Sequence, residues 1–192
     1  FPGEQVAQIR LHQDAALQAK VEKVWGELRA PTPEYFQKEI DRIHEIIKEG
    51  KSNPYDGKPL FMNKCAACHK LFADGGSIGP DLTGYQRKDT GNMLLNIVHP
   101  NAEIREGYEN YVVTMKDGRV IMGFKADEDN AIMVIRGMDG QSISLKREGI
   151  AKINAIGSSL MPQSLLNGMS DQQIRDFFAY FRTTQHLVGG KR

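Results

Sequence analysis

The chain has 192 residues and a mass of 21.5 kDa, the size of one ordinary domain or of a domain that carries an insertion. Its 25 lysines and arginines against 24 aspartates and glutamates give a net charge of +1, which does not favour a nucleic-acid binder that neutralises phosphates. With 40% hydrophobic residues the chain should fold, but its longest uncharged run, residues 153–170, contains too many polar residues to insert directly into a membrane.

Two helices are predicted before residue 52, and we expect them to form a hairpin. In residues 5–29, apolar side chains recur three and four positions apart. Thr32 is a good N-cap for the second helix, Pro33 suits its first position, and Gly50 is the expected stop. The pattern therefore predicts an N-terminal hairpin over 1–52 and a second domain over 53–192.

The second domain begins with a cysteine pair and a glycine-rich loop, and a sheet follows. A short helix is predicted from Asp89 to just before Pro100. Runs rich in Val, Ile and Tyr, separated by Asp-Gly turns, then predict a small antiparallel meander or barrel inserted over about 105–155. The expected strands are 108–115, 119–126, 131–136, 142–146 and 150–153.

An extended loop and a helix from Asp171 to about Thr183 close the chain. Ser170 and Gln173 have the spacing of a capping box, and an apolar stripe follows at helical spacing. The fold class predicted from the whole pattern is mainly α with a β insertion.

The only two cysteines stand together in Cys65-Ala66-Ala67-Cys68-His69. C-x-x-C-H is the attachment sequence of c-type haem. Two thiols three positions apart on a helix share a face and can reach the two vinyl groups on one porphyrin edge. His69, the next residue, would then place its imidazole under the iron as the proximal ligand.

Three other interpretations of this motif are weaker. A structural zinc site needs four ligands, and the chain has no second cysteine pair and no close histidine pair. A thioredoxin-like redox pair normally follows a strand, whereas residues 58–64 predict a helix. A disulfide between residues three apart on a regular helix is sterically poor.

A second axial ligand is expected from Met161. This methionine lies in an extended segment, and Pro162 after it biases its backbone away from the helical region. His99, at a predicted helix end before Pro100, is the runner-up. Met62 is too near the cysteines in the chain to reach the other face of the haem. Met122 and Met133 lie in predicted strands and are expected to pack there, and Met169 is expected to form a hydrophobic staple at the start of the last helix.

These motifs resemble the class I cytochrome c fold. Gly57 and Phe61 stand at the spacing G-x-x-x-F-x-x-x-C-x-x-C-H, and residues 79–84 match the element G-P-x-L-x-G. The resemblance implies that the first core helix crosses the last one at Gly57 and Phe61, with Phe177 and Tyr180 as partners. It also implies that the carbonyl of Pro80 accepts a hydrogen bond from Nδ1 of His69, and that residues 159–162 form the distal methionine strap.

The long interval before the strap points to a particular branch of this family. Met161 lies 92 positions after His69, and the predicted sheet fills the excess. Together with a helical hairpin that carries Trp25-Gly26, this is similar to the planctomycete-type haem-binding domain. That domain commonly closes large dehydrogenase-like or multidomain secreted proteins, so the implied partner is a redox protein or a fused dehydrogenase domain.

Several further residues are expected around the haem. Leu82 belongs to an apolar shell, and Arg87 and Tyr85 follow the glycine-rich loop at a place suited to a haem propionate. Three lysines flank the motif and could steer an acidic partner: Lys58, Lys64 and Lys70. The rest of the expected apolar shell is Leu71, Ile78, Leu94, Ile97 and Phe177.

The predicted function is a one-electron carrier with a single covalent haem c and His69/Met161 ligation, either free or as a domain of a larger oxidoreductase, rather than an enzyme by itself. The alternative is a haem sensor or a peroxidase-like protein with an open or exchangeable distal site. A third hypothesis makes the small barrel a module that binds RNA or peptide without haem. Because covalent attachment occurs outside the cytoplasmic membrane in this family, we expect a periplasmic or other extracytoplasmic location and a signal upstream.

Overall fold

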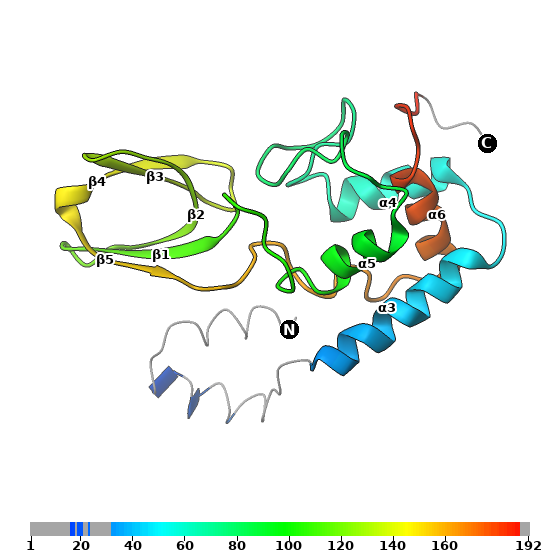
Figure 1. Ribbon diagram of the computed structural model, residues 1–192, viewed down its shortest axis with the longest axis horizontal. Helices are drawn as coiled ribbons and strands as arrows, with labels where there is room; N and C mark the ends of the chain where they lie inside the picture. The colour runs from blue at the N-terminus through cyan, green and yellow to red at the C-terminus, as the bar shows by residue number, and fades with distance from the viewer. Residues whose placement is uncertain (1–15, 18, 21–22, 24–31, 189–192) are drawn as a thin grey trace. The chain divides into compact units, whose positions relative to one another are not determined.

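The computed structural model describes residues 16–17, 19–20, 23 and 32–188, and it divides the chain into two compact units, 1–38 and 39–192 (Figure 1). Within the predicted first helix, the described residues are helical, while Trp25-Gly26 and the remainder lie outside the described residues. The hairpin over 1–52 therefore stays a prediction. In the described part of the chain, the helices are too short or too polar to cross a bilayer.

The helices start at the residues that the capping pattern predicts. The helix α3 begins at Pro33, after Thr32, whose hydroxyl accepts a hydrogen bond from the backbone N–H of Tyr35 at 3.3 Å. Ser170 and Gln173 form the predicted capping box at the start of α6. The described helices of the core are α3 (Pro33–Lys48), α4 (Pro54–Lys64), α5 (Thr90–Val98) and α6 (Asp171–Phe181).

The crossing of α4 and α6 is the centre of the helical core (Figure 1). Gly57 is necessary there, because a Cβ at this position would lie 1.9 Å from the carbonyl oxygen of Asp176. Phe61 is fully buried, with its ring centroid 5.5 Å from that of Tyr180 and 6.2 Å from that of Phe181. The crossing predicted at Gly57 and Phe61 is therefore present. Of its two predicted partners, Tyr180 meets both residues.

The sheet contains five antiparallel strands in the order β4-β3-β2-β1-β5. Its core consists of Val113, Met115, Met133, Ile135 and Leu145. The first four strands form the predicted meander, and β5 returns to pair with β1, which leaves β4 and β5 at the two edges of an open sheet. The strands are β1 (Asn110–Met115), β2 (Val120–Glu128), β3 (Ile132–Arg136), β4 (Ser142–Lys146) and β5 (Ile150–Ala155).

Two connections join the sheet to the helical core, and they are bonded to each other. The backbone N–H of Ile156, just after β5, donates to the carbonyl of Asn110 at the start of β1, at 2.9 Å. The N–H of Ser159 donates to the side-chain oxygen of Asn101, at 2.8 Å. The segment that follows β5 is thereby held beside the segment that precedes β1.

We expect Gly57→Ala to destabilise the protein by about 1–3 kcal/mol, because the added methyl group would overlap the backbone of α6 at Asp176 and force the two helices apart. Urea unfolding of the purified protein measures this. Gly91→Ala, at the exposed start of α5, is the matched control and should stay within about 0.5 kcal/mol of the parent. Equal effects of the two substitutions would show that the α4–α6 contact does not require a glycine.

Candidate functional site

The cysteine motif forms one hydrogen-bonded turn at the end of α4. Cys65 is the C-cap of this helix, with φ −124° and ψ −34°, so the motif lies just beyond the helix and not on it as predicted. The N–H of Cys65 still donates to the carbonyl of Phe61 at 2.8 Å, and the N–H of His69 to that of Cys65 at 2.9 Å. The turn therefore keeps both thiols and the imidazole within one short segment.

The glycine-rich loop packs tightly against this turn. The N–H of Gly76 donates to the carbonyl of Ala66, and that of Gly79 to the carbonyl of Cys68, both at 2.8 Å. A Cβ at Gly79 would lie 2.6 Å from Cε1 of His69, and one at Gly76 would lie 2.5 Å from the carbonyl oxygen of Ala67. Glycine at these positions lets the loop approach the motif and the imidazole closely.

His69 is oriented by the hydrogen bond that the sequence resemblance implied. Its Nδ1 lies 3.0 Å from the carbonyl oxygen of Pro80. Because a carbonyl only accepts, Nδ1 carries the proton, and in the neutral ring Nε2 keeps its lone pair free. Burial lowers the pKa of the His69 imidazole, while the bond to Pro80 acts in the opposite direction. The neutral ring with a free Nε2 is the form that binds a metal.

The surroundings of the thiols argue against a reactive redox pair, and the described residues around them offer no set of further zinc ligands. Burial, and then the neighbouring Cys68, raises the pKa of the Cys65 thiol to about 12, and burial raises the pKa of Cys68 as well. A reactive redox pair needs a thiol with a lowered pKa. Among the described residues, no cluster of three or more His, Cys, Asp or Glu side chains is arranged to hold a metal ion. Covalent attachment of haem through both sulfurs stays a prediction that these surroundings allow.

A cavity of about 340 Å³ opens beside the motif, and its walls are largely apolar. His69 and Met161 both line it, so the structure brings together two residues that are 92 positions apart in the chain. Six of the seven predicted cofactor-binding residues line the cavity: with His69 and Met161 these are Cys65, Cys68, Pro80 and Leu82, whereas Arg87 does not line it.

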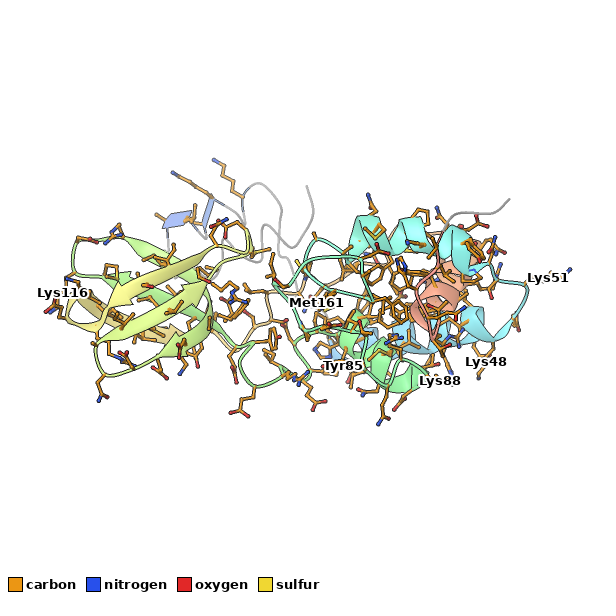
Figure 2. All side chains as sticks on the ribbon, turned by 90° about the horizontal axis from the view of Figure 1, so that it is seen from above. Lys48, Lys51, Tyr85, Lys88, Lys116 and Met161 are labelled. Carbon is orange, nitrogen blue, oxygen red and sulfur yellow. The ribbon has the colours of Figure 1, made fainter. Side chains whose placement is uncertain are left out.

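Met161 is held on the strap between β5 and α6, where the sheet meets the helical part (Figure 2). Its backbone N–H donates to the hydroxyl of Ser159 at 3.0 Å, and Ser159 is itself bonded to Asn101. His99, the runner-up ligand, is the C-cap of α5 and does not line the cavity. Two methionines that the sequence analysis did not consider as ligands do line it, Met93 and Met138.

The prediction that Arg87 binds a propionate needs correction. Arg87 is only 8% exposed, and its guanidinium donates to the carbonyls of Phe181 at 2.9 Å and Thr183 at 2.8 Å. It also donates to the carbonyls of Leu82 and Thr83. Arg87 therefore ties the end of α6 to the loop after the motif. Its guanidinium bonds backbone carbonyl oxygens and is not directed at a ligand.

The predicted apolar shell separates into two groups. Ile78, Leu82 and Ile97 line the cavity, whereas Leu71, Leu94 and Phe177 are buried in the core away from it. The sheet and its connections add three side chains to the cavity wall that sequence reasoning missed: Tyr108 before β1, Phe124 in β2 and Met138 in the β3–β4 turn. Strand alternation showed only that these segments were half-buried, because it carries no information about which other part of the chain lies against them.

The three lysines predicted to steer a partner differ in their surroundings. Lys58 lies 2.8 Å from Asp74 and donates to the carbonyl of Leu187, so its charge is locally neutralised. Its hydrogen bond is the main reason that the pKa of Asp74 is lowered, and His186 adds to the effect. Lys70 is 3.9 Å from Asp81, and Lys64 lines the cavity. Steering by all three lysines stays a prediction, and Lys58 is the weakest contributor.

The comparison with known families adds to this geometry. A model of the cytochrome c family matches residues 55–136. The match supports a class I cytochrome c. It includes the C-x-x-C-H motif and β1–β3, and it stops before the strap and α6, so it covers less than half of the chain. No curated protein matches the chain. The cytochrome c family implies covalently bound haem c and suggests haem-based electron transfer.

We expect Gly79→Ala to lower the yield of haem-loaded protein roughly 10-fold, because the methyl group would displace the His69 ring and break its bond to Pro80. The ratio of haem absorbance to polypeptide measures this. Gly84→Ala, in the same loop, is the control, because its added methyl group would meet no atom within 4 Å. Normal loading of the Gly79 variant would mean that the close contact with His69 is dispensable.

Proposed function

We propose that this chain is a c-type cytochrome module that carries single electrons on one haem c. Cys65 and Cys68 would form the two thioether bonds, and His69 and Met161 would be the axial ligands. The haem supplies an iron that changes between the ferric and ferrous states. One observation carries the proposal: a proximal imidazole with a fixed tautomer and a methionine thioether line one apolar cavity beside two cysteines.

The residues of the cavity fit the group. Nδ1 of His69 is occupied by the Pro80 carbonyl, which leaves Nε2 for the iron. Burial raises the pKa of both thiols, so they are in the neutral S–H form, and each would add across one vinyl group to give a thioether. Apolar walls exclude water from the ring and disfavour the extra charge of the ferric state.

Ligation by Met161 would make the iron a carrier and not a site of substrate chemistry. With an imidazole on one side and a thioether on the other, no coordination position is open to oxygen or peroxide. A soft thioether stabilises the ferrous state, so the reduction potential should be higher than with two histidines. This distinguishes the proposal from a haem sensor or a peroxidase-like protein.

The proposed partner is a redox protein or a fused dehydrogenase domain, and the proposed location is extracytoplasmic. The location follows from the family resemblance, because covalent haem attachment in that family takes place outside the cytoplasmic membrane. The partner follows from the dehydrogenase-like proteins that the resembling domain commonly closes. Lys64, which lines the cavity beside Cys65, supports an approach of an acidic partner to this edge. A fused partner would need no docking of its own, since the effective concentration along one chain is high.

The experiment is the substitution Met161→Leu in protein matured with haem. Leucine keeps the volume of methionine but removes the sulfur, so we expect intact covalent haem, a high-spin ferric spectrum, rapid binding of carbon monoxide and a lower midpoint potential.

Met93→Leu and Met138→Leu are the matched controls, because both residues line the same cavity. Each should keep the low-spin spectrum and the methionine-to-iron charge-transfer band of the parent. If the parent already binds carbon monoxide rapidly, the distal site is open and the sensor alternative is correct. If a control variant loses the band instead, that methionine is the ligand.

A further inference from the structure

One polar pair stands out in the wall of the cavity. Arg105 and Tyr85 both line it. The guanidinium carbon of Arg105 lies 5.7 Å from the centre of the Tyr85 ring, and its Nη1 donates to the Tyr85 hydroxyl at 3.3 Å. A cation stacked on a phenol in the wall of an apolar cavity can form an ion pair with an anionic group of a ligand bound there.

The chemistry of haem supplies such an anion. A haem that is attached through its two vinyl groups presents two propionate carboxylates from its other two rings. Two cationic side chains line the cavity, Lys64 and Arg105. Lys64 is next to Cys65 in the chain and therefore belongs to the thioether edge. That leaves Arg105 for the carboxylates.

We propose that Arg105, supported by Tyr85, binds a haem propionate and sets the pH dependence of the reduction potential. This inference rests on the proposed function, because it needs the covalent haem. It replaces Arg87 with a residue that the sequence analysis did not consider. Arg105 lies on the segment that leads from α5 to β1, so the connection into the β-sheet would be part of the cofactor site.

Backbone hydrogen bonds fix the segments that carry Arg105 and Tyr85. The N–H of Tyr108 donates to the carbonyl of Arg105 at 3.0 Å, and the Tyr108 ring packs on Phe124 with centroids 5.5 Å apart. The N–H of Tyr85 donates to the carbonyl of Leu82 at 3.2 Å, and that of Arg87 to the carbonyl of Tyr85 at 2.8 Å. Arg87 thus acts indirectly, since it anchors the loop that presents Tyr85.

Tyr85 lies on the same side of the helical part as Met161, toward the sheet (Figure 2). A guanidinium suits this place because its planar fork of donors matches a carboxylate and its face stacks on the phenol. Apart from Cys65 and Cys68, whose sulfurs the thioether bonds would occupy, the other ionisable side chains that line the cavity are Lys64, Glu103, Tyr108 and the His69 imidazole. Glu103 repels a propionate, which makes the cation of Arg105 more necessary.

The consequence is electrostatic. A guanidinium beside a carboxylate lowers the pKa of that carboxylate by about 1–3 units, and an exposed pair lies at the low end of this range. Removing it should raise the propionate pKa in both oxidation states. The ferric haem, which carries the extra positive charge, keeps the propionate ionised to lower pH than the ferrous haem does. The midpoint potential therefore falls with rising pH in the window between the two pKa values.

The test is the midpoint potential of holoprotein measured from about pH 5 to about pH 9. For Arg105→Gln we expect normal covalent haem and a normal low-spin spectrum, a lower potential at neutral pH, and a pH-dependent window moved upward by about one pH unit. Arg105→Lys keeps the charge without the planar fork and should lie between the parent and the glutamine variant. Tyr85→Phe should move the window in the same direction by a smaller amount.

Arg119→Gln is the matched control. This exposed arginine pairs with Asp117 in the β1–β2 turn and does not line the cavity, so its loss should leave the curve unchanged. Superimposable curves for Arg105→Gln and Arg119→Gln, with haem intact in both, would overturn the assignment of Arg105 and leave the proposed function standing. A parent protein without covalent haem would overturn the proposed function and this inference together.

Discussion

The hydrogen bond between Nδ1 of His69 and the carbonyl of Pro80 is the contact on which the rest of the site depends. It fixes the tautomer, and it also fixes the path of the loop, because Gly79 must lie against the imidazole for the Pro80 carbonyl to reach it. A side chain at that position would separate the acceptor from the ring. Gly79 is therefore a requirement of the histidine geometry and not merely a sign of a turn.

The histidine is in turn placed by the crossing of α4 and α6. The motif follows α4 directly, so the distance between the two helices sets the position of Cys65 and of every residue after it. Gly57 permits that close approach, and Arg87 holds the far end of α6 to the loop beyond the motif. Gly57 and Arg87, which precede and follow the cysteine segment in the chain, thus both contact α6, Gly57 at Asp176 and Arg87 at Phe181. Core packing and site geometry are one constraint in this protein.

The local part of this arrangement could be predicted from the sequence, and the non-local part could not. Residues close together in the chain are enough to predict the caps at Thr32 and Ser170, the strands and the C-x-x-C-H motif. The role of Arg87 was wrong because nothing in its own segment shows that the end of α6 would bring carbonyl oxygens to it. Arg105 was missed for the same reason. Its partner, Tyr85, is 20 positions away, across a helix.

The sheet is best understood through its contact with the cavity. If it were an independent module, its residues would close only their own core of Val113, Met133 and Leu145. Instead Phe124 and Met138, which lie on or after different strands, reach the cavity wall, and the strap that leaves β5 carries Met161 into it. The sheet therefore shapes the cavity at two places, a wall and a strap. Because water near a haem lowers its potential, a wall built partly from the sheet would raise the reduction potential of the proposed haem.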